Sequence, residues 1–142
     1  MAIFTPSIEQ IMQFKVKPEL GELALLSFLE KNLDDSYEVY FNPYMNGDRP
    51  DIIILRRRYG VLIIEVKDWN LENYKLDEKK HWILKQNESR VKSPISQVLK
   101  YKDNLFELHI ESLLEQKIKD IRKFNMVACA VYFHNANIDQ IN

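Results

Sequence analysis

The stretch RPDIIILRRRYGVLIIEVKDW, residues 49–69, contains two runs of branched apolar residues with charged residues at their ends. Asp51 opens the first run, Glu65 nearly closes the second, and Lys67 follows two residues later. Apolar runs of this length predict buried β-strands. Because a charged group is costly to bury, its presence at the end of such a strand needs a structural or a chemical explanation.

A hairpin between the two runs, with its turn near Arg58, brings the charged residues together. In an antiparallel pair with this turn, the numbers of facing residues sum to about 116, so Asp51 lies opposite Glu65. Side chains alternate between the two faces of a strand, so Lys67 shares a face with Glu65. A bulge in the turn would shift the register and move one partner to the other face.

Two carboxylates on directly opposite strand positions raise each other's pKa unless a positive charge lies beside them. Lys67 could supply that charge, and so could a divalent cation, since Mg²⁺ is typically held by one or two carboxylates plus a substrate phosphate. Lys67 beside the metal could then orient an attacking water and stabilise charge on the phosphate. In the alternative interpretation, Asp51 ends a turn and the pair Glu65 and Lys67 forms a neutral, exposed strand end. The spacing alone leaves both interpretations open.

The remaining periodicity predicts an α/β domain with the order helix, three strands, hairpin, helix, strand, which implies a mixed β-sheet flanked by helices. Residues 1–17 show no clear periodicity and are expected to be a lead-in, and residues 18–142 form one domain that could belong to a longer chain. The expected elements are a helix from Pro18 to Leu33 with Leu23, Leu25, Leu26, Leu29 and Leu33 on its apolar stripe, strands at 36–43, 51–55 and 61–67, a hairpin at 73–87, a helix capped by Ser93 with apolar residues at 95, 98, 99, 105 and 108, and a buried strand at 125–133.

Composition excludes several classes of protein. The single cysteine, Cys129, cannot form an internal disulfide and is expected in the core, which fits a reducing, cytoplasmic location. The first residues lack the features of a secretion signal, and no apolar run approaches the roughly 20 residues of a membrane span. The chain has three glycines and no phosphate-binding loop, and its three histidines are too far apart for a zinc motif.

Five features follow one another along the chain: a helix with Gly-Glu in LGELALLSFL, the Asp-led strand RPDIIIL, Gly60 before the next strand, the stretch IIEVKDW, and a Pro-x-x-Gln helix start in SPISQVLKY. Taken in this order, they resemble the nuclease-related domain, NERD, within the PD-(D/E)XK nuclease superfamily. The likeness spans about residues 18–133. It implies a restriction-endonuclease-like, three-layer core. The chain departs from the family pattern in lacking a glycine in DWNLENYKLDEKKHW and in having Ser-Pro where Asn-Pro is more usual.

The resemblance also implies a role for each matching residue, with Mg²⁺ or Mn²⁺ as the cofactor and DNA, rather than RNA, as the expected substrate. Asp51 and Glu65 would be metal ligands, with the Val66 carbonyl as a third, and Lys67 would be the catalytic lysine. Glu22 would support this metal or a second one. Gln97 would position substrate or water. From the residues alone, Glu22 could equally be an exposed acid that the helix dipole favours, and Gln97 a surface residue.

A basic segment follows the proposed site, because residues 75–102 carry eight Lys or Arg against three Asp or Glu. Such a segment could follow the phosphates of DNA without reading its bases, or it could simply be a solvated face. The candidate DNA contacts are Lys79, Lys80, Lys85, Arg90, Lys92, Lys100 and Lys102. Trp69 could stack on a base or cap a core.

The sequence therefore predicts a metal-dependent nuclease that hydrolyses DNA phosphodiester bonds. The alternative is a nucleic-acid-binding or recruitment module, weakly active or inactive, fused to a helicase or kinase in a larger protein. A purely structural domain would bind neither metal nor DNA. The resemblance also leaves room for a homodimer, because many nucleases of this kind dimerise to cut both strands.

Overall fold

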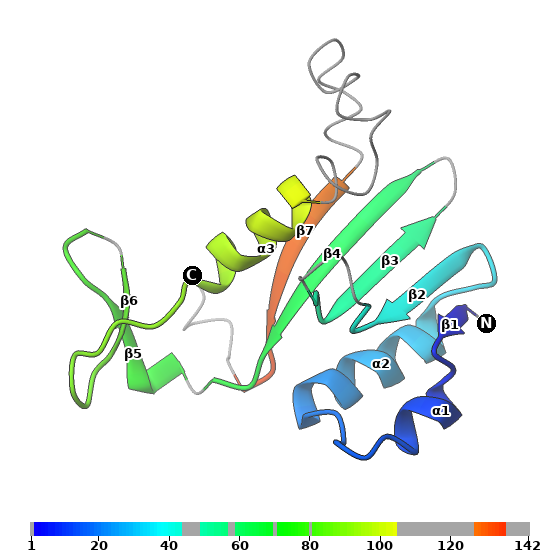
Figure 1. The fold of residues 1–142 in the computed structure, drawn as a ribbon, viewed down its shortest axis with the longest axis horizontal. Coiled ribbons are helices and arrows are strands. Elements are labelled where there is room, and N and C mark those ends of the chain that lie inside the picture. Colours follow the sequence, from blue (N-terminus) through cyan, green and yellow to red (C-terminus); the bar gives the residue numbers. More distant parts are fainter. Residues whose placement is uncertain are drawn as a thin grey trace, which may run out of the picture.

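The computed structural model describes residues 2–43, 49–56, 59–69, 71–79, 81–104 and 127–135. Its centre is a mixed sheet of five strands in the order β1-β2-β3-β4-β7, in which β1 runs parallel to β2 and β4 parallel to β7, while the inner pairs are antiparallel (Figure 1). The predicted α/β class with a mixed sheet is thus confirmed. The strands are β1 (Ile3–Thr5), β2 (Tyr37–Phe41), β3 (Ile52–Arg56), β4 (Gly60–Lys67) and β7 (Val127–Phe133).

The register of β3 against β4 is the one that the hairpin predicts. Ile53 faces Ile63, and the last ladder pair at the open end joins Ile52 to Ile64. One further step along the same register places Asp51 opposite Glu65. At the closed end, Gly60 has a φ of 145°, a backbone conformation that side chains other than glycine rarely adopt.

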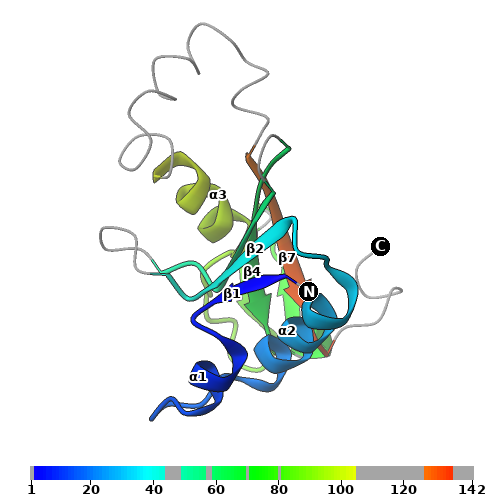
Figure 2. The same cartoon turned by 90° about the vertical axis from the view of Figure 1, so that its right-hand side faces the viewer.

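Two helices cover opposite faces of the sheet and complete three layers (Figure 2). Helix α2 (Leu20–Asn32) buries Leu26 and Leu29 against the even-numbered side chains of the central strands, including Ile52 and Ile64. Helix α3 (Pro94–Asn104) covers the other face, where the odd-numbered side chains point. There Val98 and Tyr101 pack on Ile53 and Ile63. Because the two central strands are buried on both faces, their sequences read as continuous apolar runs.

The first residues form two elements that the sequence did not predict. Strand β1 pairs with β2 at the edge of the sheet, and helix α1 (Ile8–Met12) follows it. The Ser7 Oγ accepts the backbone N–H of Gln10, which caps the helix, and Ile11 is fully buried. A strand of three residues and a helix of five are too short to produce a recognisable period, which explains why they escaped prediction.

Helix α3 begins as predicted but buries a different stripe. The Ser93 Oγ accepts the backbone N–H of Ser96 (3.3 Å), so the expected cap is present. The prediction that Ile95 and Leu99 face the core is wrong, since about half of each side chain is exposed. Val98 and Tyr101 supply the buried contacts instead, and the expected positions 105 and 108 lie outside the described residues.

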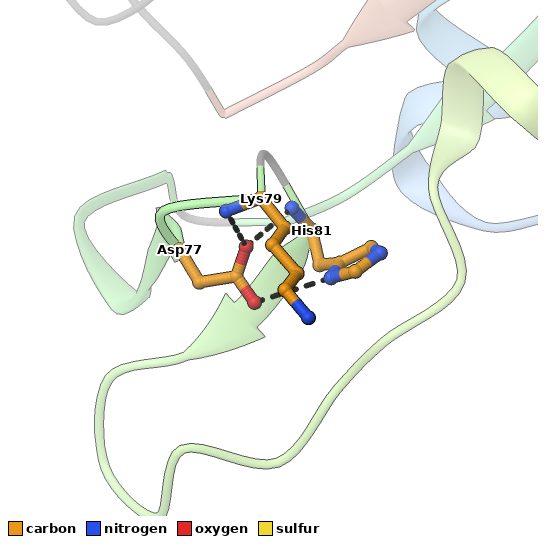
Figure 3. Close-up of polar contacts among 3 residues, drawn as sticks. All are labelled: Asp77, Lys79 and His81. Atoms are coloured by element: carbon orange, nitrogen blue, oxygen red, sulfur yellow. Dashed lines mark hydrogen bonds and ion pairs between the residues drawn. The ribbon is translucent and has the colours of Figure 1, made fainter.

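The small hairpin beyond β4 forms as predicted, from β5 (Tyr74–Leu76) and β6 (Trp82–Leu84), after a short 3₁₀ turn at Leu71–Asn73. Figure 3 shows how Asp77 holds its turn. One carboxylate oxygen accepts the backbone N–H groups of Lys79 and His81 at 2.9 and 2.8 Å, and the other lies 3.2 Å from the His81 Nδ1. These bonds lower the pKa of Asp77, the N–H of His81 most of all.

Within the described part of the chain, no helix has both the length and the apolar character needed to cross a membrane.

Candidate active site

The candidate site begins where β3 and β4 end their pairing. Asp51 lies just before β3, and its Oδ2 accepts the backbone N–H of Val66 at 2.7 Å. Val66 lies beyond the last paired residues of β3 and β4. The Asp51 carboxylate therefore satisfies a backbone N–H group that no β3 carbonyl reaches. A carboxylate has about four acceptor positions, so this bond leaves Asp51 able to bind a further donor or a cation.

Glu65 is the buried charged residue at the centre of the site, with only 3% of its surface exposed. Its Oε1 lies 3.2 Å from the Lys67 Nζ, whereas its Oε2 is buried without a hydrogen-bond partner among the described residues. Burial, followed by the negative charge of Asp51, raises the pKa of Glu65 to about 7, against the opposing effect of Lys67. Burial also raises the pKa of Asp51, although the Val66 N–H opposes this.

Lys67 lies between this carboxylate and an aromatic cluster. Its Nζ is 5.4 Å from the centre of the Trp69 ring, within cation–π distance. Trp69 in turn stacks on Tyr74 with ring centres 4.3 Å apart, and it also contacts Trp82 and Phe133. The cluster joins the end of β4 to the small hairpin and to β7, so the ring beside Lys67 is supported from several elements. Trp69 thus packs in this cluster, and its stacking on a base stays a prediction.

The charged residues open into a cavity of about 360 Å³. Helix α2 reaches this cavity with its first turn, where Glu22 is one of the lining residues. The Oε1 of Glu22 accepts the backbone N–H of Glu19 (3.0 Å), so this carboxylate also caps its own helix. Burial raises the pKa of Glu22, while the Glu19 N–H opposes the change. The cavity is lined by Glu19, Glu22, Asp51, Glu65, Val66, Lys67, Asp68 and Trp69.

Two acids of this cavity were missed from the sequence. The pKa of Glu19 is raised, chiefly because its carboxyl group shares a hydrogen bond with Asp68, and burial adds to the effect. Strict alternation would place Asp68 on the face opposite Lys67, but β4 ends at Lys67 and the alternation ends with it. The Oδ1 of Asp68 is buried and has no hydrogen-bond partner among the described residues. Two features of the sequence could have indicated these acids. Asp68 directly follows the strand that carries Glu65 and Lys67, and Glu19 lies three residues before Glu22.

Gln97 does not line this cavity. It lies on α3 one turn before Tyr101, and its amide donates to the Tyr101 hydroxyl at 3.1 Å. Gln97 lies on the side of α3 that faces the sheet. The sheet face that α3 covers carries the odd-numbered side chains, and Glu65 is one of these. Its role as a positioning residue stays a prediction.

The basic residues predicted to contact DNA fall on two neighbouring parts of the chain. Those that follow β5 lie on the hairpin and the segment after it, and the last two lie on α3. Lys102 is half-buried, Lys80 lies outside the described residues, and the others are exposed, namely Lys79, Lys85, Arg90, Lys92 and Lys100.

The donor groups of the site suit a small, hard cation. In the part of the chain that the structure describes, no three Asp, Glu, His or Cys side chains are placed to hold one ion together. An ion here would therefore rely on Asp51, Glu65, the Val66 carbonyl, water and substrate, which is the mixed coordination typical of Mg²⁺. The partnerless Glu65 Oε2, buried beside Asp51, is the oxygen that such an ion would satisfy.

The three-layer fold, with two carboxylates and a lysine at the open end of the β3–β4 hairpin, defines a restriction-endonuclease-like α/β domain. A search of protein families supports the same conclusion, because the model of the nuclease-related domain, NERD, matches residues 17–139. The chain therefore belongs to the nuclease-related domain family. No curated protein and no solved structure matched the chain.

Proposed function

We propose that this domain is a divalent-metal-dependent nuclease that hydrolyses phosphodiester bonds in DNA. The observation that carries the proposal is the Glu65 carboxylate, which is almost fully buried, keeps one oxygen unpaired, and lies beside a second carboxylate in an open cavity. Lys67 pairs with only one oxygen of this carboxylate. Burying a carboxylate costs several kcal/mol of desolvation, so a domain that had only to fold would gain from an apolar residue here.

Asp51, Glu65 and the Val66 carbonyl are the groups that would hold Mg²⁺ or Mn²⁺. When bound, such an ion offsets the charge of the phosphate and lowers the pKa of water. Glu22 lines the same cavity and would support the ion through water, since its Oε1 already accepts a backbone N–H.

Lys67 has the position of a group that assists the attacking water. Glu65 and the ring of Trp69 flank its ammonium group, which limits the directions in which its donors can point. Directed donors of this kind stabilise the charge that develops on phosphate oxygens. In the reaction the water oxygen bonds to phosphorus, the bond from phosphorus to one sugar oxygen breaks, and that oxygen leaves with a proton.

A cleavage assay with supercoiled plasmid and linear DNA, in Mg²⁺ or Mn²⁺, tests this proposal. We expect wild-type protein to cut, and Lys67→Ala to cut about 10²–10³-fold more slowly, the usual effect of losing one preorganised donor. Lys31→Ala is the control, because Lys31 is exposed in the last turn of α2, away from the cavity. Equal cleavage by the wild type and Lys67→Ala would contradict the proposed mechanism.

The alternative function is a nucleic-acid-binding module without cleavage. The exposed basic residues of the hairpin and α3 favour it, because they could hold DNA without any contribution from the carboxylates. Retention of DNA by wild type and Lys67→Ala alike, with no cutting by either, would establish this alternative.

A further inference from the structure

A second cavity lies on the other side of Glu22, and nothing in the proposed chemistry uses it. Its volume is about 330 Å³, and three cationic side chains line it together with Glu22 and two aromatic rings. We propose that this cavity binds a phosphate of the substrate strand, close to the phosphate that is cleaved. The inference rests on the proposed function for the identity of the strand. The cavity residues that carry it are Lys15, Lys17, Arg49, Glu22, Phe14 and Phe41.

The segment that supplies two of the cations is anchored to the sheet by one aromatic contact. Residues 13–19 join α1 to α2, and Phe14 in this connection packs on Phe41 of β2, with ring centres 6.3 Å apart. Lys17 donates a hydrogen bond to the Met12 carbonyl, so its side chain folds back along the connection. An ammonium group has three donors, and it can keep this bond while binding a phosphate oxygen.

The other wall of the cavity is connected directly to the candidate metal ligand. Arg49 is separated from Asp51 only by the fully buried Pro50. Asn42, which also lines the cavity, donates its backbone N–H to the Asp51 carbonyl at 2.7 Å. A phosphate bound by Arg49 would therefore lie beside the segment that carries Asp51.

The charges of the two cavities are complementary in a way that suits a polyanion. The first cavity has five carboxyl groups and one lysine, so by itself it repels DNA. The second has three cations and a single carboxyl group, and Glu22 belongs to both. A strand carries one phosphate per nucleotide and Glu22 borders both cavities, so a strand with a phosphate at the first cavity can place a neighbouring one at the second.

Contacts of this type position a strand without reading its sequence. Arginine and lysine side chains both bind phosphate through charge-assisted hydrogen bonds, the lysines as point charges. We therefore expect the cavity to contribute affinity and alignment, with no base preference.

The test is the binding of a fluorescently labelled single-stranded DNA, measured by anisotropy in EDTA over a series of salt concentrations. EDTA prevents cleavage, so binding is measured apart from the chemistry. For single strands, each phosphate contact contributes about 0.7 to the slope of log K against log salt. Because the cavity binds a single phosphate, we expect the slope to fall by up to about 0.7 in the double variant Lys15→Ala/Lys17→Ala and likewise by up to about 0.7 in Arg49→Ala. The control Lys31→Ala, an exposed cation at the far end of α2, should keep the wild-type slope.

Wild-type slopes in both cavity variants would overturn the inference, and so would a wild-type chain that binds no DNA. A smaller slope of log K against log salt in the variants supports the phosphate site, whether or not the wild type cuts DNA. If the wild type does not cut, only the nuclease proposal is contradicted. When the wild type cuts, we expect the variants to raise KM more than they lower kcat. Circular dichroism at each salt concentration verifies that the variants are folded.

Discussion

At the scale of single residues, Glu65 is in the least favourable surroundings of the titratable groups in the candidate site. One oxygen is paired with Lys67 and the other is buried beside Asp51 without a partner. Because burial and a neighbouring negative charge both disfavour the ionised form, the pKa of this side chain rises from 4.5 to about 7. Its protonation therefore affects stability over the ordinary working range of pH.

Glu65→Gln should remove this pH dependence. Below pH 4.5 the side chain is protonated in both the folded and the unfolded state, so its ionisation does not lower the free energy of unfolding. As pH rises toward 7, the unfolded state releases a proton that the folded state keeps, so the free energy of unfolding falls until Glu65 ionises in both states. At about 1.36 kcal/mol per pKa unit, the loss above pH 7 is at most about 3 kcal/mol.

Urea unfolding at pH 5 and pH 8, without metal, measures this effect. The Gln variant, which resembles protonated Glu, should lose less stability than the wild type between the two values. Glu78→Gln, at an exposed position in the hairpin turn, should behave as the wild type does. If Glu65→Gln and the wild type lose the same stability, Glu65 does not carry the proton.

Part of this site could be predicted from residue numbers alone. Asp51 is predicted to lie opposite Glu65 because side chains alternate along a strand and because the position of the hairpin turn sets the register. Both are properties of the backbone. Glu19 and Asp68 could not be found in this way. They reach the cavity because a helix packs across the end of the sheet and because β4 ends at Lys67, and both facts depend on tertiary packing.

At the scale of elements, the docking of α2 on the end of β4 depends on Gly21. A Cβ at this position would lie 2.7 Å from the Asp68 Oδ1 and 3.0 Å from both the His134 Cβ and the Val66 Cγ1. The helix can approach the site only because this side chain is absent. That contact gives a physical reason for the Gly-Glu pair, since it brings Glu22 to the cavity.

Gly21→Ala should therefore destabilise the domain even though alanine is the better helix former. Helix propensity favours the change by about 1 kcal/mol, whereas overpacking at a tight contact costs about 1–3 kcal/mol. We expect a net loss in the free energy of unfolding and a weaker response to metal. Ser27→Ala, on the exposed side of the same helix, is the matched control and should not destabilise. A Gly21→Ala variant as stable as the wild type would show that the helix can move without cost.

The central strands, helices α2 and α3, strand β7 and the small hairpin were predictable, whereas the two short first elements, β1 and α1, were not. The apolar runs of β3 and β4 specified the centre of the sheet because both of their faces are buried. Strand β1 depends on a parallel pairing with β2, which leaves no local pattern. In α3 the apolar residues outnumber the positions that contact the sheet, so composition could not show which of them, such as Leu99, would stay exposed.

At the scale of the whole molecule, the formal net charge of −1 conceals a separation of charge. Carboxyl groups gather in the cavity between α2 and the end of β4, three cations line the neighbouring cavity, and further exposed cations lie on the hairpin. A polyanion could be held by these cations while its scissile phosphate meets the carboxylates only in the presence of a metal. The fold would then bind nucleic acid weakly by itself and align it when a divalent ion is present.

Metal binding should therefore stabilise the domain, and more so at higher pH. An ion that binds only the folded state adds RT ln(1 + [L]/Kd) to its stability, about 2.7 kcal/mol at a hundred times Kd. Below pH 7 the ion must displace the proton that the raised pKa of Glu65 retains, so its apparent affinity falls. We expect the Tm of the wild type to rise with Mn²⁺ at pH 8 and to rise much less at pH 6. Asp51→Asn should abolish the shift at both values, whereas Glu78→Gln should preserve it. An equal Tm shift in Asp51→Asn and the wild type would place the ion elsewhere on the protein.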